Sequence, residues 1–198
     1  MDLGFRETLT LLIVVIVLSA LLSIVGVSWR NGISPMPSSR QVRRVVAAEA
    51  QRLAAPGLIV EAGSGWGTLG IEVAKSCKES RVVGIENSPI PLRVSQVAAW
   101  LAFGVRPKPR AARSSLSGPS VSFRRGNIYK VPYAAADLVI CYLYPGAMKR
   151  LSSIFRDQLA PGASVISVCF AIPDWQPVRV ITCNDLYRTK VYVYKTNS

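Results

Sequence analysis

The sequence predicts an α/β fold, a doubly wound and mostly parallel sheet, preceded by one transmembrane helix. Short runs rich in Val and Ile alternate with longer segments of helical spacing, which is the pattern of successive strand–helix–strand units. A long uncharged apolar segment lies near the N-terminus. A chain of 198 residues with 50% hydrophobic content has room for one domain with a proper core and one extra segment.

The extra segment runs from Thr8 to Trp29, 22 residues without a charge. As a helix that rises about 1.5 Å per residue, it matches a hydrocarbon core about 30 Å thick. A cleavable signal peptide would have a basic start and a small-residue cleavage site, and a core helix would show a polar stripe. Neither pattern is present. We therefore predict a membrane anchor over residues 1–30, a linker over 31–39 and one globular domain over 40–198.

Basic residues around this segment predict its orientation. Arg6 alone precedes it, whereas four arginines follow it: Arg30, Arg40, Arg43 and Arg44. Positive residues collect on the cytoplasmic side of a membrane helix. We expect a single-pass membrane protein whose domain lies in the cytoplasm or, in mitochondria, on the matrix side of the inner membrane.

The four cysteines agree with a reducing compartment, because they are widely spaced and none belongs to a C-x-x-C pair. The chain has no histidine to complete a metal site, so we expect buried thiols and no metal. Without histidine, Ser-His-Asp and Cys-His nucleophilic schemes are excluded. Any chemistry must proceed without an imidazole.

The elements of the globular domain follow in order. After the connector NGISPMPSS, a helix is predicted over 40–55, and LIVEA (58–62) is a strand of buried type. A helix over 67–77, a strand over 82–87 and a helix from about 91 to 103 come next. Four more strands are predicted at 121–127, 136–143, 163–172 and 190–195, with a helix over 146–159. Ligands in such sheets bind at the carboxyl ends of the strands, near the switch point.

The stretch EAGSGWG, residues 61–67, lies at such a strand end. Gly63, Gly65 and Gly67 let the backbone turn tightly and let a ligand approach where a Cβ would clash. Glu61 would lie at the mouth of the same crevice. Nineteen residues after Gly67 the next strand ends in Glu86, where a carboxylate can accept both hydroxyls of a ribose. This order of elements predicts a Rossmann-like nucleotide site: a strand, a glycine turn, a helix and a second strand that ends in an acid.

Two nucleotide families fit these glycines. GWGTLG (65–70) matches the dinucleotide fingerprint G-x-G-x-x-G, but that fingerprint begins directly at the strand end, and here EAGS intervenes. The stretch from Glu61 instead resembles motif I, (D/E)-x-G-x-G-x-G, of the class I S-adenosylmethionine-dependent methyltransferases. The resemblance implies that the glycine loop packs on the cofactor, that Glu61 helps to hold its amino group, and that Glu86 binds its ribose. Asn127 falls where many members have an Asp that meets the adenine amino group.

A narrower resemblance covers most of residues 34–177. SPMPSSRQV, VVGIENSP, ADLVICYLYPGAMKRL and GASVISVCFAIPDWQP are similar to membrane-anchored protein lysine methyltransferases related to the mitochondrial ATP-synthase c-subunit and ADP/ATP-carrier enzymes. Two positions depart from that family. Trp66 stands where the family usually has Asp, and Ser88 separates Asn87 from Pro89. The resemblance implies S-adenosyl-L-methionine as cofactor and a lysine acceptor on a protein, with a membrane protein as one candidate substrate.

Methyl transfer to an amine needs alignment of the reacting atoms at about 3–3.5 Å more than it needs acid or base groups, which suits a chain without histidine. Tyr142 and Tyr144 follow the strand whose end carries the acceptor site in class I enzymes. Their ring faces and hydroxyls can meet an amine, although core packing explains such tyrosines equally well. Pro173, Asp174 and Trp175 line the acceptor channel by resemblance.

Charge leaves other functions open. The formal net charge is +13, and Arg106 to Arg125 holds six basic residues and no acid. A solvated loop near anionic lipid is the favoured interpretation. Nucleic acid is less favoured because no recognition helix or aromatic platform accompanies the charge, so an RNA methyltransferase is the second hypothesis. A non-catalytic membrane adaptor that retains a nucleotide-binding fold is the third.

Overall fold

The computed structural model describes residues 4–31, 38–53, 56–104 and 120–196. The chain divides into two compact units, Met1–Pro35 and Met36–Ser198. The predicted linker over 31–39 falls mostly outside the described residues.

The first unit contains the helix α1 (Phe5–Asn31), which includes the whole predicted segment from Thr8 to Trp29. Its large apolar side chains from Leu9 to Leu22 are exposed, by 46% at Val14 to 71% at Leu22. Within the described residues, no helix combines the length and the apolar character needed to cross a membrane. The predicted transmembrane span is therefore not supported by the structure.

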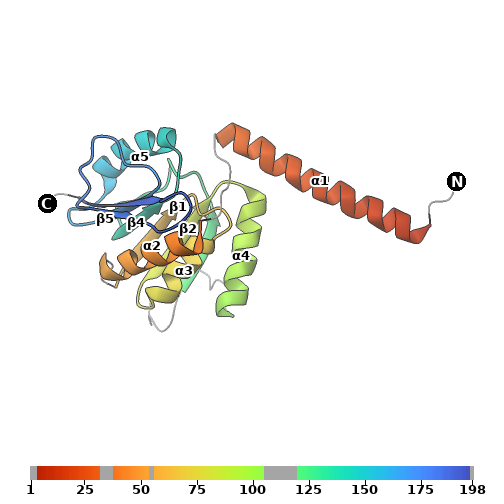
Figure 1. Ribbon diagram of the computed structural model, residues 1–198, viewed down its shortest axis with the longest axis horizontal. Coiled ribbons are helices and arrows are strands. Elements are labelled where there is room, and N and C mark those ends of the chain that lie inside the picture. Colours follow the sequence, from red (N-terminus) through yellow and green to blue (C-terminus); the bar gives the residue numbers. More distant parts are fainter. Residues whose placement is uncertain (1–3, 32–37, 54–55, 105–119, 197–198) are drawn as a thin grey trace. The chain divides into compact units, whose positions relative to one another are not determined.

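The second unit is built on a sheet that has seven strands in the described residues, in the order β3-β2-β1-β4-β5-β7-β6 (Figure 1). The strands are β1 (Leu58–Ala62), β2 (Arg81–Glu86), β3 (Ser120–Arg125), β4 (Leu138–Cys141), β5 (Ser164–Val168), β6 (Arg179–Thr182) and β7 (Lys190–Lys195). The first five are parallel, and β7 is antiparallel to both β5 and β6. The predicted α/β fold with a mostly parallel sheet is confirmed.

Strand β1 lies at the switch point of this sheet, because it pairs with β2 on one side and with β4 on the other. From β1 the chain first builds outward to β3 and then returns to add β4 and β5 on the opposite side. The carboxyl ends of β1, β2 and β4 consequently meet at one edge, where a ligand is expected.

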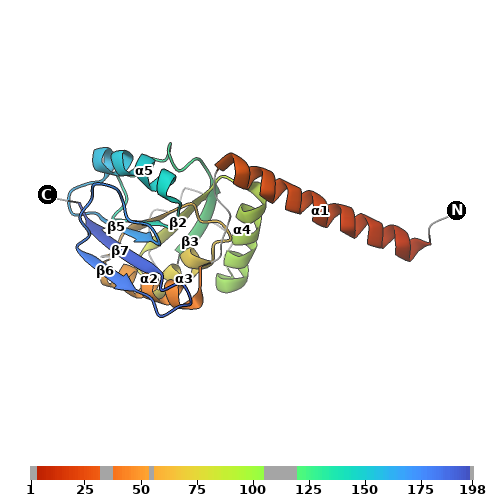
Figure 2. The same ribbon diagram turned by 45° about the horizontal axis from the view of Figure 1, so that its top comes forward.

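Helices cover both faces of the sheet, as Figures 1 and 2 show for α5 on one face and α2 and α3 on the other. The helices of this unit are α2 (Arg40–Leu53), α3 (Thr68–Ser76), α4 (Pro89–Phe103) and α5 (Pro145–Gln158). A core cluster joins α2 and α3 to Ile59, Leu138 and Ile166 of the sheet. A smaller cluster joins α3 and α4 to Phe123 of β3. On the other face, α5 buries Met148, Leu151, Phe155 and two small residues.

Strand β6 is the element that the sequence pattern did not predict. Its burial pattern is exposed at three of its four positions, so it shows none of the alternation that marks a half-buried strand. The strand predicted over 163–172 ends at Val168, because Cys169 adopts a φ of 73°, which breaks extended geometry.

Candidate active site

The glycine loop after β1 has three positive φ angles on alternate residues, 78° at Gly63, 50° at Gly65 and 76° at Gly67. An added Cβ would come within 2.6 Å of Leu143 at Gly63, and within 2.6 Å of Ser95 at Gly67. At Gly65 it would meet nothing within 4 Å. The outer two glycines are therefore required by packing, whereas Gly65 faces open space that a ligand can occupy.

Glu86, at the end of β2, holds this loop in place. Its Oε2 accepts the backbone N–H of Gly65 at 2.8 Å, and its Oε1 accepts that of Ser88 at 2.7 Å. The backbone N–H groups of Gly63 and Ser64 both donate to the Ile85 carbonyl at 3.0 Å. Each carboxylate oxygen keeps a lone pair for a further donor, so Glu86 has capacity for the two hydroxyls of a ribose.

Glu61 lies beneath the loop and is 3% exposed. Burial raises its pKa to about 8, the negative charge of Glu86 adds to this, and the N–H of Gly70 opposes it. Within the described residues, Glu61 Oε2 and Ser64 Oγ are buried without a hydrogen-bond partner. Buried polar atoms without a partner cost free energy. Glu61 Oε2, on β1, and Ser64 Oγ, in the glycine loop, are polar atoms that the amino-acid portion of a bound cofactor can satisfy.

Asn127 follows β3, and the adjoining Gly126 donates its N–H to the Glu86 carbonyl at 3.0 Å. The side-chain Oδ1 of Asn127 accepts the backbone N–H of Tyr129 at 2.9 Å. This amide oxygen therefore stabilises the local turn and keeps one lone pair for an external donor. Contact with an adenine amino group stays a prediction.

The structure separates the two tyrosines that the sequence nominated together. Tyr142 packs against the core cluster on the α2 face, and burial, reinforced by Cys169 and Asp185, raises its pKa. Tyr144 is half-buried at the N-cap of α5, and its phenol is one of the groups that raise the pKa of Tyr129. Tyr142 directly follows β4 and Tyr144 lies at the N-cap of α5, and an acceptor role for either tyrosine stays a prediction.

Tyr129 and Arg150 are further candidate site residues, which the sequence analysis did not nominate. The guanidinium carbon of Arg150, on α5, lies 4.0 Å from the centre of the Tyr129 ring, within the range of a cation–π interaction. Burial, followed by the hydrogen bond to Tyr144, raises the pKa of Tyr129 to about 12, although Arg150 opposes this. No motif marks Tyr129, and its position two residues after Asn127 is the one available signal.

Tyr133 fixes the loop that carries Tyr129. It is fully buried, its hydroxyl donates to the Ile128 carbonyl at 2.7 Å, and its ring packs edge-on against Phe155 of α5 at 5.0 Å. The loop after β3 and the helix after β4 are thereby joined. The contact between Tyr129 and Tyr144 consequently has a rigid support.

The loop after β5 contains the predicted channel residues Pro173, Asp174 and Trp175. Ser152 of α5 donates its hydroxyl to the Pro173 carbonyl at 3.1 Å, and Asp174 has a φ of 63°. Trp175 packs edge-on against Tyr194 at 6.0 Å. These contacts fix the loop against α5 and β7, and a channel function for it stays a prediction.

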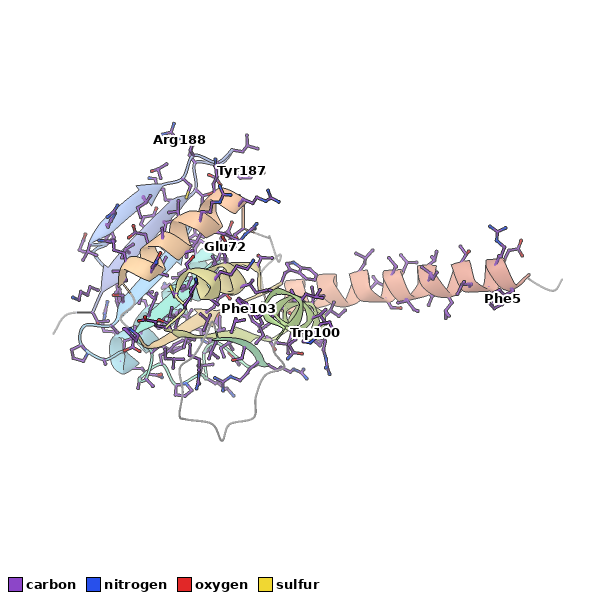
Figure 3. All side chains as sticks on the ribbon, turned by 90° about the horizontal axis from the view of Figure 1, so that it is seen from below. Phe5, Glu72, Trp100, Phe103, Tyr187 and Arg188 are labelled. Atoms are coloured by element: carbon purple, nitrogen blue, oxygen red, sulfur yellow. The ribbon has the colours of Figure 1, made fainter. Side chains whose placement is uncertain are left out.

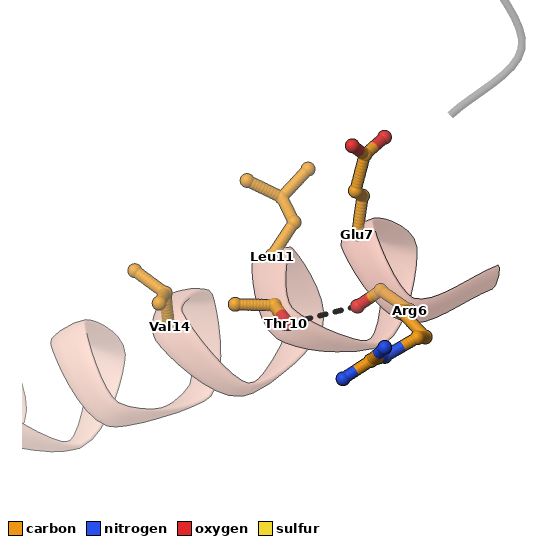
Figure 4. Close-up of a pocket in the computed structure, with 5 residues that line it drawn as sticks. All are labelled: Arg6, Glu7, Thr10, Leu11 and Val14. Atoms are coloured by element: carbon orange, nitrogen blue, oxygen red, sulfur yellow. Dashed lines mark hydrogen bonds between the residues drawn. The ribbon is translucent and has the colours of Figure 1, made fainter. Parts of the chain in front are cut away.

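A separate hollow lies on α1 and is lined by residues of that helix alone: Arg6, Glu7, Thr10, Leu11 and Val14 (Figure 4). The Thr10 hydroxyl there donates to the Arg6 carbonyl at 2.8 Å. This bond is local to the helix, and the hollow shares no residue with the glycine loop.

Comparison with known proteins identifies the family. A model of the ANTKMT methyltransferase domain matches residues 61–179. The chain is 31% identical over 144 residues to the adenine nucleotide translocase lysine N-methyltransferase of Mus musculus, covering 73% of this chain and 56% of that protein. It is 31% identical over 140 residues to the ATP synthase c-subunit lysine N-methyltransferase of Rattus norvegicus, covering 71% and 56%. The chain thus spans just over half the length of these two relatives.

Solved structures show the same fold. An RNA methyltransferase from Salinibacter ruber, in complex with S-adenosyl-L-homocysteine, superposes with a TM-score of 0.67 at 27% identity, covering 82% of this chain and 95% of that one. A methyltransferase from Geobacter sulfurreducens gives 0.59 at 16% identity, covering 88% of each chain.

The family match and the cofactor product bound to the Salinibacter ruber protein confirm S-adenosylmethionine as the cofactor, and the residues at the glycine loop fit it. The resemblance predicted from motif I and from the later strand motifs is also confirmed. The chain belongs to the ANTKMT methyltransferase family.

Proposed function

We propose that this protein transfers a methyl group from S-adenosylmethionine to the side-chain amine of a lysine on a protein substrate. The observation that carries the proposal is the proximity of Tyr129, in the loop after β3, to Tyr144, at the N-cap of α5 after β4, at the carboxyl edge of the sheet. Two relatives named as lysine N-methyltransferases support the acceptor, as does a protein-lysine N-methyltransferase of Saccharolobus islandicus, 25% identical over 151 residues, covering 76% of this chain and 84% of that protein.

The cofactor supplies an electrophilic methyl group on a sulfonium, which a neutral amine attacks as the carbon–sulfur bond breaks. The protein's task is to position that amine. Aromatic faces attract a cationic lysine, and a tyrosine oxygen has a lone pair to accept an amine N–H. Because the pKa of Tyr129 is about 12, its hydroxyl stays protonated at neutral pH and cannot act as the base. The lysine, whose reference pKa is about 10.4, must lose its proton before transfer, and water can accept it.

RNA is the second candidate substrate. The net charge of +13 and the 27% identity to the RNA methyltransferase of Salinibacter ruber favour it. It ranks below lysine because the relatives named as lysine methyltransferases of Mus musculus and Rattus norvegicus are matched at 31% identity.

The two substrates are separated by incubating the full chain with labelled S-adenosylmethionine and fractionated membranes, soluble proteins and RNA. Methyl-lysine in hydrolysed protein is the expected product. Label confined to RNA would replace lysine by RNA as the acceptor. Cofactor binding without label in any fraction would favour the non-catalytic adaptor. The Gly65→Val variant, which blocks the cofactor space, is the matched control for background methylation.

We also propose that α1 attaches the protein to a membrane, with the second unit on the cytoplasmic or matrix side. The exposed Leu, Ile and Val side chains between Leu9 and Leu22 support attachment, because a helix that is apolar all round is normally buried in protein or lipid. The excess of arginine after α1 supports the orientation.

Fractionation of cells tests this attachment. The full chain should sediment with membranes and resist alkaline extraction, and Val15→Asp with Leu18→Asp should release it. Thr8→Asn with Thr10→Asn, on the same helix, is the control that keeps the apolar side chains. Release of the unaltered chain by alkali would contradict the attachment.

A further inference from the structure

Helix α4 presents an apolar face to solvent in addition to the face that it packs on the sheet. It buries Leu92, Ser95 and Ala99 against the core. On the outer side, Val94 is 43% exposed, Val97 55%, Trp100 53% and Leu101 72%. Figure 3 shows Trp100 pointing away from the sheet and Phe103 on the inner side of the helix.

The outer residues form one continuous stripe. Arg93, Val97 and Trp100 recur at helical spacing, and Val94 and Leu101 lie next to them on the helix surface. A helix that merely covers a sheet would be polar on this side. Four large exposed apolar residues on one face are typical of an interaction surface.

Positive charge accompanies this stripe. Arg93, exposed on the same face, is the one charged residue of α4, which contains no acid. The neighbouring strand β3, reached by a hydrogen bond from Gln96 to the Phe123 carbonyl at 3.2 Å, ends in two exposed arginines, Arg124 and Arg125. An apolar stripe that contains a tryptophan and carries Arg93 at one end is complementary to lipid headgroups that are anionic above an apolar interior.

We propose that the outer face of α4 docks on an anionic lipid bilayer, with Trp100 and Leu101 in the interfacial region and Arg93 among the headgroups. This docking rests on the second unit alone and requires neither α1 nor the proposed acceptor. Because α4 begins at Pro89, three residues after Glu86, contact along α4 also fixes the orientation of the cofactor edge relative to the bilayer.

The depth of Trp100 in the bilayer is the direct test. The full chain is mixed with vesicles of phosphatidylcholine, with or without phosphatidylglycerol, in which the acyl chains carry bromine, a quencher of tryptophan fluorescence. The chain has four tryptophans, so the Trp100 signal is the emission of the wild type minus that of Trp100→Phe. Trp175→Phe is the matched control, because Trp175 is half-buried in the loop after β5.

With phosphatidylglycerol present, the Trp100 signal should be strongly quenched and the Trp175 signal should not. Arg93→Gln should weaken the docking about fivefold, the usual effect of one basic residue near an anionic surface. If the chain binds vesicles and Trp100 is not quenched, the proposal is wrong. The outer face of α4 would then be assigned to a protein partner or to a second copy of the chain. Equal quenching in vesicles without phosphatidylglycerol would overturn the role of charge. Failure of the chain to bind any vesicle would overturn docking itself.

Discussion

Glu86 Oε2 accepts the backbone N–H of Gly65 at 2.8 Å, so the acid at the end of β2 and the glycine loop after β1 form one unit. The other oxygen of the same carboxylate accepts the N–H of Ser88, the N-cap of α4. Loss of this carboxylate therefore removes a ligand for the cofactor and also releases the loop that shapes its space.

Glu86→Ala should weaken cofactor binding by about 1–3 kcal/mol, the scale for losing hydrogen bonds to a charged acceptor. Isothermal titration calorimetry with S-adenosylmethionine measures this. Glu86→Gln keeps one oxygen acceptor and should lose less affinity than Glu86→Ala. Equal affinities for the wild type and Glu86→Ala would show that this acid does not contact the cofactor.

Gly65→Val should abolish measurable cofactor binding, because the added side chain fills the open space of the loop. Valine at a φ of 50° is also strained, by about 1–2 kcal/mol. Gly162→Val separates the two effects. Gly162 has a φ of 83°, also faces open space, and lies before β5, at the opposite edge of the sheet. That control should lose similar stability in urea and bind the cofactor normally. If both variants bind normally, Gly65 does not border the cofactor site.

Most of the sheet could be predicted from the sequence, because β1, β2, β4 and β5 are buried at nearly every position and are rich in Val and Ile. The alternation of strands with helices predicted that the sheet is mostly parallel, but not the order of its strands. Strand β6 could not be predicted, since it is an exposed edge whose stability comes from pairing with β7. The strand with which β6 pairs is decided by the tertiary structure, and no local sequence pattern indicates it.

The candidate cofactor residues could be nominated from the sequence, because they are local to two strand ends and follow a motif, and their contacts with the cofactor stay predictions. The acceptor residues also stay predictions. Tyr142 and Tyr144 are two residues apart and look equivalent in the sequence, yet the first packs against the α2 face and the second meets Tyr129. The partner residues Tyr129 and Arg150 come from the loop after β3 and from α5, and their approach depends on how α5 packs.

Glu61→Gln should remove the part of the pH dependence of the free energy of unfolding that Glu61 causes. Burial raises the pKa of Glu61 from 4.5 to about 8. Below pH 4.5 Glu61 is protonated in both the folded and the unfolded chain. Its contribution to the free energy of unfolding is therefore fully retained there. Between pH 4.5 and 8 the unfolded chain binds fewer protons, and the free energy of unfolding falls by up to about 1.4 kcal/mol per pH unit.

Urea unfolding across this pH range measures the effect as the difference between the wild type and Glu61→Gln. The wild type should become less stable relative to the variant as pH rises towards 8. Saturating S-adenosylmethionine should reduce this relative loss, because a cationic amino group beside Glu61 favours the ionised carboxylate. Parallel stability profiles for the two proteins would place the pKa of Glu61 near its ordinary value.

Tyr129→Phe and Tyr144→Phe should each lower kcat for a lysine acceptor about tenfold or more and leave cofactor affinity unchanged, because the proposed acceptor site contains both hydroxyls. The two changes should not add, since the two phenols lie close enough to interact. Tyr142→Phe is the control, because Tyr142 packs against the core on the α2 face and its loss of a hydroxyl should leave kcat unchanged.

Single-turnover rates with labelled cofactor are measured for the wild type, for the single variants Tyr129→Phe and Tyr144→Phe, and for the variant that combines them. Together with calorimetric affinities, these rates give all the terms of the double-mutant cycle. Fully additive losses would show that the two tyrosines act separately. A larger loss in Tyr142→Phe than in Tyr144→Phe would return the acceptor site to the other tyrosine of the pair that the sequence first indicated.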